Sequence, residues 1–248
     1  MITVAILTKN NEETIEKTLL SLKEFDEVIL LDNGSTDETL KIAGRLPNVT
    51  IYKTHFTSFG DLRNQLAKKA RHDWILALDS DEVLSAKLSN EIRNHPLKKD
   101  TLYDLPFHNF YRGKRVKCCG WYPESHVRLY NRTHTSFSQD RVHEKIMEKG
   151  PIHTFKYPVY HTPYRSQDDF LRKMQVYSQL FADQNVGKKS SFQKALSHGV
   201  WAFFRSYILK KGIFYGETGF TLSLYNANTA FYKYLKLKEK NATHSPFS

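Results

Sequence analysis

The feature that most constrains the fold of this chain is a regular alternation of strand-like and helix-like segments over its first 80 residues. Short apolar runs predict four strands, at residues 2–7, 28–31, 49–52 and 74–78. Helical spacing of apolar residues predicts helices between them, at about 10–22, 35–46 and 62–70. Asn10 with Glu13, and Ser35 with Glu38, have the spacing of helix-capping pairs. This order predicts an α/β fold with a mostly parallel sheet flanked by helices.

Acidic side chains follow two of these strands. Asp32 ends the second strand, and Asp79-Ser80-Asp81 follows the fourth. Ligands of parallel sheets bind beyond the carboxyl ends of the strands. Two neighbouring carboxylates suit Mg²⁺ or Mn²⁺ that also binds substrate phosphates. Many D-x-D triplets are solvated loops, but the position after a buried strand favours the metal site. Asp32 is either a turn residue bonded to nearby backbone or a contact to a nucleotide's base or ribose.

The remaining chain divides into an irregular middle and a helical tail. Residues 103–111, 114–120 and 126–130 are expected to be a mixture of strands and loops, and residues 155–160 a strand. The tail is expected to form helices at about 168–183, 190–211 and 217–237. We expect a catalytic domain at 1–163 and a helical extension at 164–248, packed on the same core.

The net charge of +11 is unevenly distributed. Residues 1–150 hold 23 Lys and Arg against 21 Asp and Glu, whereas residues 151–248 hold 14 against 5. The tail interleaves these cations with aromatic residues, among them Trp201, Phe204 and Phe214. This pattern suits an anionic membrane surface or a solvated edge of a packed helix. Nucleic acid is not expected as a partner, because no nucleic-acid motif occurs.

Several segments, in this order, resemble the family 2 glycosyltransferases of the GT-A fold. The segments are TKNNEETIEKTLLSL, VILLDNGSTDET, Arg63-Asn64 and WILALDSDE. Later segments are similar to a branch that contains bacterial lipopolysaccharide core β-glucosyltransferases. These are GWYP at 120–123, VRLY at 127–130, VHE at 142–144, PVYH at 158–161 and KM at 173–174. One departure is Asn11, where the family commonly has Glu.

The resemblance implies roles for individual residues on the donor side. Thr8 and Asn10 would line the nucleotide pocket, and Asp32 would contact the base. Arg63 would lie near the nucleotide and its phosphates, although on its own it could equally be a helix-surface cation. Asp79 would reach the ribose and the metal, and Asp81 would hold the metal on the diphosphate.

Transfer of a sugar also requires a base, because the acceptor hydroxyl must lose a proton as it attacks. We favour Glu144, with Asp140 as the competing candidate. A third interpretation pairs Glu144 with Lys145 or Arg141 in a surface ion network. His143 would orient Glu144 or the acceptor.

Other side chains could complete the site. His161 is either a structural residue or a contact to the metal or diphosphate. Arg128 could bind a phosphate bidentately. Trp121 and Tyr122 could form a platform for an acceptor sugar, or they could be ordinary half-buried aromatics.

These expectations favour an inverting, metal-dependent glycosyltransferase. Its donor would be a UDP-linked hexose, glucose in the first place, and its acceptor a lipopolysaccharide core or another lipid-linked glycan. The alternatives are a nucleotidyltransferase, which the absence of glycine from ILTKNNEET disfavours, and a non-enzymatic basic module, which would leave the strand-end aspartates unexplained. The start of the chain lacks a signal-peptide pattern, so we expect a cytoplasmic enzyme, peripheral on the inner face of the membrane.

Overall fold

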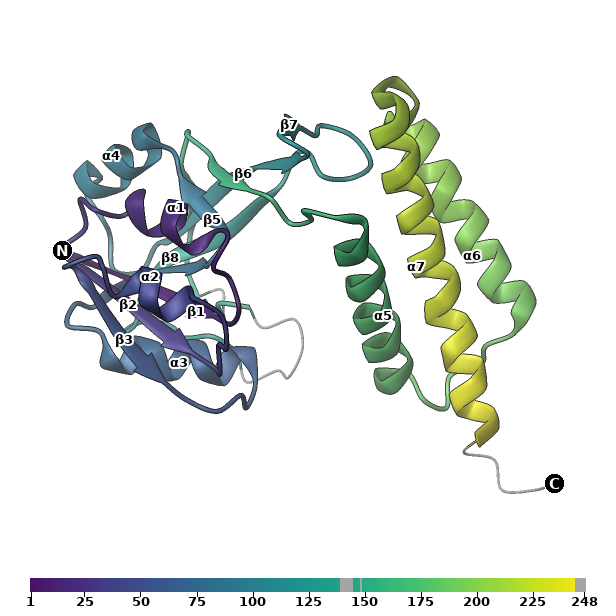
Figure 1. The fold of residues 1–248 in the computed structure, drawn as a ribbon, viewed down its shortest axis with the longest axis horizontal. Coiled ribbons are helices and arrows are strands. Elements are labelled where there is room, and N and C mark those ends of the chain that lie inside the picture. The colour runs from purple at the N-terminus through teal and green to yellow at the C-terminus, as the bar shows by residue number, and fades with distance from the viewer. Residues whose placement is uncertain (139–144, 148, 244–248) are drawn as a thin grey trace. The chain divides into compact units, whose positions relative to one another are not determined.

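The computed structural model describes residues 1–138, 145–147 and 149–243. The chain forms two compact units (Figure 1). The first comprises 1–110 and 124–162, and the second comprises 111–123 and 163–248. The main division, after residue 162, is one residue from the expected boundary. However, residues 111–123 belong to the second unit, where the sequence had placed them in the first.

The first unit contains the expected parallel sheet. Its strands are β1 (Ile2–Thr8), β2 (Glu27–Asp32), β3 (Val49–Lys53) and β4 (Trp74–Asp79). They lie in the order β3-β2-β1-β4, and all of their pairings are parallel. Thr8 pairs with Asp32, and Leu7 pairs with Asp79. The register therefore brings the polar ends of three strands to one edge of the sheet.

The sheet continues beyond β4 with mixed strand directions. The order is β4-β8-β6-β10-β5, from β8 (Ser125–Asn131), β6 (Leu102–Tyr111), β10 (Val159–His161) and β5 (Glu82–Leu84). A short β9 (Ile152–Thr154) pairs with β6. The strand expected at 155–160 is wrong in its bounds, since only its end lies in β10. Phe155 instead packs into the apolar core, where it is 2% exposed.

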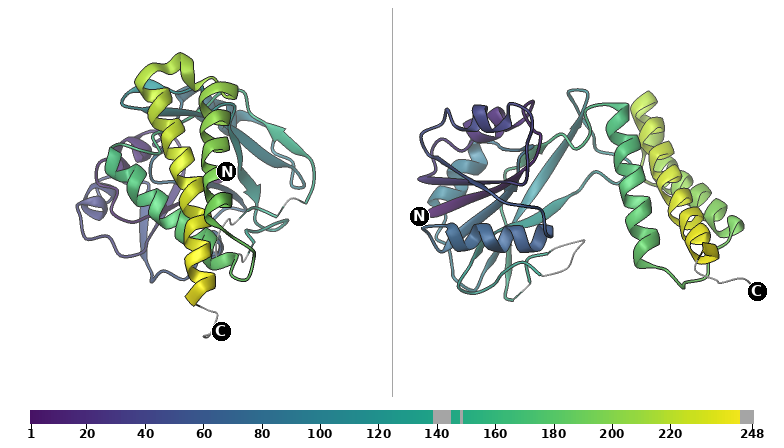
Figure 2. Two further views of the ribbon diagram at one scale, coloured as in Figure 1. Left: turned by 90° about the vertical axis from the view of Figure 1, so that its right-hand side faces the viewer. Right: turned by 60° about the horizontal axis from the view of Figure 1, so that its bottom comes forward.

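Helices cover both faces of this sheet (Figures 1 and 2). On one face, α1 (Ile15–Leu20), α2 (Thr39–Ala43) and α4 (Ala86–Asn94) pack on alternate residues of the strands, such as Val4 and Ile6. On the other face, α3 (Phe59–Lys69) packs on the residues between them, such as Ala5 and Leu7. Burial on both faces explains why β1 reads as a continuous apolar run.

The two predicted capping pairs are wrong. Helix α1 begins at Ile15 and α2 at Thr39, and neither has a side-chain cap. Asn10 instead adopts a left-handed conformation, with φ of 52°. Its amide N–H donates to Ser35 Oγ at 3.0 Å, and its Oδ1 accepts from the Thr36 N–H at 2.8 Å. These polar groups link the loops after β1 and β2, so they are not available to cap helices.

The second unit is helical and has its own apolar cluster. Its elements are β7 (Lys114–Arg115), α5 (Gln167–Gln184), α6 (Phe192–Phe204), the π-helical turn η1 (Arg205–Leu209), the 3₁₀ turn η2 (Gly212–Tyr215) and α7 (Gly216–Thr243). Its cluster consists of Tyr111, Val116, Cys118, Cys119, Phe170 and Leu222. Of residues 114–120, expected to mix strand and loop, only β7 is a strand. The helix expected to continue to Lys211 changes from α-helical to π-helical winding after Phe204. None of the helices within the described residues has the length and apolar content needed to span a bilayer.

Candidate active site

The centre of the site is a network of charged side chains at the carboxyl end of β4. The carboxylate of Asp79 contacts two guanidinium groups. Its Oδ1 lies 2.5 Å from Arg63 Nη2, and its Oδ2 lies 3.0 Å from Arg128 Nη2. Arg128 also contacts Glu82, whose other oxygen accepts the Asp79 N–H at 3.0 Å. Two cations and two carboxylates thus meet from α3, β4, β5 and β8.

Burial makes this network electrostatically strong. The side chains of Arg63, Arg128 and Glu82 are 5%, 14% and 1% exposed. Burial by itself would raise the pKa of Asp79, but the charges of Arg63 and Arg128 hold that pKa well below its usual range. The pKa of Glu82 is raised to about 7. Burial is the largest cause, the charge of Asp79 adds to the rise, and the charge of Arg128 opposes it. Asp79 is therefore a firmly ionised carboxylate.

A second pair lies beside this network. His161 Nε2 is 3.5 Å from Asp81 Oδ2, and its Nδ1 is 3.0 Å from Asn109 Oδ1. The sheet register explains the arrangement, since His161 pairs with Glu82 on β5 and with Asn109 on β6. Burial would lower the pKa of His161, but its hydrogen bond to Asp81 and the nearby carboxylate charges raise it above the ordinary value.

The carboxylates and the imidazole of this region are candidate ligands for a metal ion. No group of three His, Cys, Asp or Glu side chains among the described residues is arranged to hold one. Asp81 and His161 provide a carboxylate and an imidazole, whereas both oxygens of Asp79 already contact arginines. A pair of protein donors fits a Mg²⁺ or Mn²⁺ ion whose other ligands are phosphate oxygens and water. It does not fit a closed structural site.

The ends of β1 and β2 form the other side of the candidate site. The Asp32 carboxylate accepts from the backbone N–H groups of Gly34 and Ser35 at 3.1–3.2 Å. This matches the turn interpretation, and it leaves the proposed base contact untested. Thr8 Oγ1 and Asn33 Oδ1 are buried without a hydrogen-bond partner within the described part of the chain. Buried polar atoms are normally paired, so this strand edge is incompletely satisfied.

A cavity of about 420 Å³ adjoins the charged network. Arg128 lines it together with residues of β8 and of the segments around 137 and 146. Phe137 and Ile146 form an isolated bridge, and the Ser138 N–H donates to the Lys145 carbonyl at 2.8 Å. The Arg63 guanidinium lies 5.3 Å from the centre of the Phe137 ring. The segments that flank residues 139–144 are therefore anchored next to the charged network.

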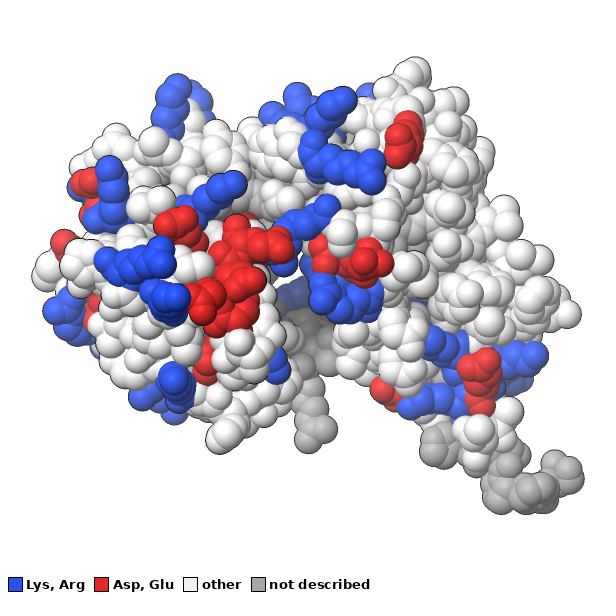
Figure 3. Space-filling view, viewed as in Figure 1, with Lys and Arg blue, Asp and Glu red and all other residues white. Residues whose placement is uncertain are grey.

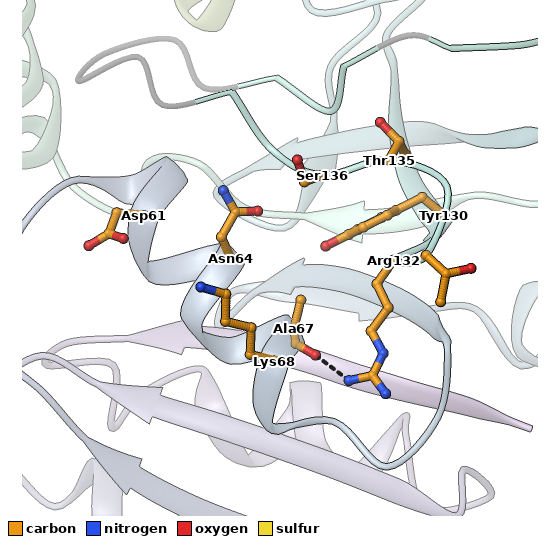
Figure 4. Close-up of a pocket in the computed structure, with 9 residues that line it drawn as sticks. Asp61, Asn64, Ala67, Lys68, Tyr130, Arg132, Thr135 and Ser136 are labelled. Atoms are coloured by element: carbon orange, nitrogen blue, oxygen red, sulfur yellow. Dashed lines mark hydrogen bonds between the residues drawn. The ribbon is translucent and has the colours of Figure 1, made fainter.

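A larger cavity, about 560 Å³, lies between α3 and the chain after β8 (Figure 4). Asn64, Lys68, Tyr130 and Ser136 contribute to its lining, and none of the residues expected to bind a donor does so. Arg132 closes its lower side by donating to the carbonyls of Ala67 and Ala70 at the end of α3. These bonds have a structural role, because they satisfy free carbonyls at a helix C-terminus.

The remaining expected site residues lie outside the described residues or in the second unit. Glu144, Asp140 and His143 lie outside the described residues. Trp121 and Tyr122 belong to the second unit, where Trp121 stacks on Tyr164 with ring centres 5.6 Å apart. The Tyr122 side chain is 49% exposed. An acceptor platform formed by these two aromatic residues remains a prediction.

Two members of the site, Glu82 and Asn109, were not assigned from the sequence. Glu82 directly follows Asp81, so its place beside the acidic motif was a usable signal. Asn109 is 52 residues from His161, and only the pairing of β6 with β10 joins them. No sequence pattern marks that contact.

Comparison with known proteins identifies the enzyme class of this chain. Residues 3–97 match the sequence model of glycosyl transferase family 2. An uncharacterized glycosyltransferase of Rickettsia typhi is 29% identical over 254 residues, spanning 96% of this chain and 87% of that protein. One from Rickettsia conorii is 27% identical, spanning 97% and 90%. These matches confirm the expected enzyme class, a glycosyltransferase, and the match to the family 2 model is confined to residues 3–97.

A solved structure confirms the expected fold class. The mannosyltransferase PcManGT from Pyrobaculum calidifontis, in complex with GDP-Man and Mn²⁺, superimposes with a TM-score of 0.52 at 16% identity. The alignment covers 99% of this chain and 76% of that one. The aligned residues therefore include the sheet of the first unit and the C-terminal helices.

Proposed function

We propose that the chain is an inverting, metal-dependent glycosyltransferase that transfers a hexose, glucose from UDP-glucose, to a lipopolysaccharide core or another lipid-linked glycan. The observation that carries the proposal is the adjacency of the Asp81–His161 pair to the Asp79–Arg63–Arg128 network. A sugar nucleotide needs both parts, because its diphosphate is an anion that gains charge as the sugar departs.

The donor side uses residues from three strand ends. Thr8, Asn10 and Asp32 line the nucleotide pocket, and the unpaired Thr8 hydroxyl supports this assignment. Arg63 and Arg128 hold Asp79 in place and contribute positive charge towards the diphosphate.

Asp81 and His161 would hold the metal ion. Asp79 reaches it only if one of its arginine contacts is exchanged. When bound, the ion supplies positive charge to the departing diphosphate.

On the acceptor side, Glu144 is the proposed base and Asp140 its competitor. Lys145, which follows Glu144 in the chain, lines the 420 Å³ cavity that also contains Arg128. An acceptor hydroxyl in this cavity would lie close to the segment that carries the base. His143, Trp121 and Tyr122 are proposed to contact the acceptor.

A lipid-linked acceptor agrees with the positive charge of the tail. After residue 150 the chain contains 14 Lys and Arg but only 5 Asp and Glu. We therefore propose that the C-terminal helices bind an anionic membrane surface.

The donor proposal is tested with a panel of sugar nucleotides in Mn²⁺, Mg²⁺ or EDTA. Thermal shift and release of nucleoside diphosphate are the readouts. Asp81→Ala should abolish the metal-dependent shift with the preferred donor. Asp26→Ala, an exposed carboxylate just before β2 at the opposite end of the strands, should leave it unchanged. A metal-dependent shift that survives in Asp81→Ala would remove Asp81 from the site.

The base proposal is tested with Glu144→Gln and Asp140→Asn. Glu144→Gln should bind the donor normally and lose transfer by about 100-fold or more, as expected for loss of a general base. Asp140→Asn should retain transfer. If the two variants exchange these behaviours, Asp140 is the base.

A further inference from the structure

The second unit exposes a continuous apolar face on α6. Phe192, Leu196, Val200 and Phe204 recur every four residues along the helix, and Trp201 lies beside them. Their side chains are 49%, 49%, 62%, 44% and 55% exposed, respectively. All five line one shallow depression. Ile208 in η1 continues the same spacing and is 42% exposed. We call these six residues the α6 face.

The opposite side of α6 is already covered by protein. Ala195 is fully buried, and a Cβ added at Gly199 would approach the Phe231 Cβ on α7 to 3.2 Å. The His198 ring stacks on Tyr234, also on α7, with centres 4.0 Å apart. Apart from Phe192, whose ring meets that of Phe231 on α7 edge-on with centres 6.2 Å apart, the α6 face therefore lies away from the side by which this helix packs. Leaving so many large apolar side chains exposed along one helix is a mark of an interaction surface.

The segment that carries this face has charge of one sign. From Gln184 to Gly216 the chain contains no Asp or Glu, but it contains Arg205 and five lysines, at 188, 189, 194, 210 and 211. In Figure 3 the drawn surface over α6 and α7 is mostly uncharged, and charged side chains of both signs lie towards its ends. The segment thus combines an apolar helix face with flanking side chains whose charges are all positive.

We infer that the α6 face inserts into the interfacial region of an anionic lipid bilayer, with the helix lying parallel to the surface. A second copy of the chain would bring cations against cations, whereas lipid phosphates would neutralise them. Exposed aromatics such as Trp201 and Phe204, which stack at 5.8 Å, suit the boundary between headgroups and acyl chains. This rests on the membrane binding of the C-terminal helices in the proposed function, and it specifies which residues meet the lipid.

The test is sedimentation of the full chain with lipid vesicles. Vesicles of phosphatidylcholine mixed with phosphatidylglycerol should bind it at low salt, and phosphatidylcholine alone should bind it far less. Leu196→Ser with Val200→Ser should weaken binding by about tenfold or more, because apolar carbons leave the acyl boundary. Leu171→Ser with Val176→Ser on α5 is the matched control, since those side chains are 59% and 48% exposed. It should bind within about twofold of the original chain.

Three results would overturn the inference. These are no binding to anionic vesicles at low salt, equal losses in the two double variants, or dissociation of a dimer by the α6 variant without any change in vesicle binding. Unchanged thermal unfolding of each variant shows that it is folded. The donor-dependent thermal shift is read in parallel without lipid, so failure of membrane binding is distinguishable from failure of the proposed transferase activity.

Discussion

Replacing Arg63 by Met tests whether the charged network holds the site together. Arg63 Nη2 contacts Asp79, and its Nη1 donates to the Leu78 carbonyl at 3.3 Å. A charged hydrogen bond contributes about 1.5–3 kcal/mol, and the bond to the carbonyl about 1 kcal/mol. The cation–π contact with Phe137 adds about 0.5–1 kcal/mol.

Two effects reduce this sum. The Asp79 side chain is 44% exposed, so water and Arg128 replace part of the lost contact. The Met side chain also recovers some apolar burial. We therefore expect a loss of about 2–3 kcal/mol in the free energy of unfolding. For a domain of this size, that corresponds to a melting temperature lower by about 5–10 °C.

The assay is urea and thermal denaturation of the ligand-free protein, combined in a double-mutant cycle with Asp79→Asn. The coupling energy between the two sites should be about 1–2 kcal/mol. Arg45→Met, an exposed arginine after α2, is the control and should change stability by less than about 0.5 kcal/mol. A coupling below about 0.5 kcal/mol would refute the reasoning, because the ion pair would then not stabilise the fold.

Two further predictions concern the framework. Glu27 accepts hydrogen bonds from the Thr3 hydroxyl and from the backbone N–H and Nε of Arg71. Burial would raise the pKa of Glu27, but these partners lower it below the ordinary value. Glu27→Gln should lower the free energy of unfolding by about 1.5–3 kcal/mol at neutral pH. The difference in stability between the variant and the original chain should shrink as pH falls below about 4.5 and through the folded-state pKa. Urea unfolding measures it, and a difference that grows in acid would contradict the prediction. A Cβ at Gly219 would lie 1.8 Å from the Gly212 carbonyl oxygen, so Gly219→Ala should destabilise the second unit by about 3 kcal/mol or more. Thermal denaturation measures both this variant and its control, Gly44→Ala. A Cβ at Gly44 would lie 3.4 Å from its nearest neighbouring atom, so that change should be nearly neutral.

The parallel half of the fold was predictable because β1, β2 and β4 are buried on both faces and carry uninterrupted apolar runs. The helix starts were not. Asn10 and Ser35 have the composition of caps, yet they bond to each other's loops across 25 residues of sequence. Local patterns cannot reveal such a choice between partners.

The candidate site divides in the same way. Asp32, Asp79 and Asp81 were predictable from their positions after strands. The pairing of Asp81 with His161 was anticipated only as one of two interpretations, and Glu82 and Asn109 were missed. Their contacts depend on β5, β6 and β10, which are joined by strand pairing rather than by sequence proximity.

The loop that carries Ser80 and Asp81 is very short, since β4 ends at Asp79 and β5 begins at Glu82. Both flanking residues are fixed by the arginine network, and the Ser80 carbonyl accepts from Thr14 and Thr18 at 3.0–3.1 Å. Few backbone torsions remain free between these anchors. Binding of a charged ligand at Asp81 would therefore cost little conformational entropy, and affinity at this edge is governed by electrostatics rather than by loop ordering.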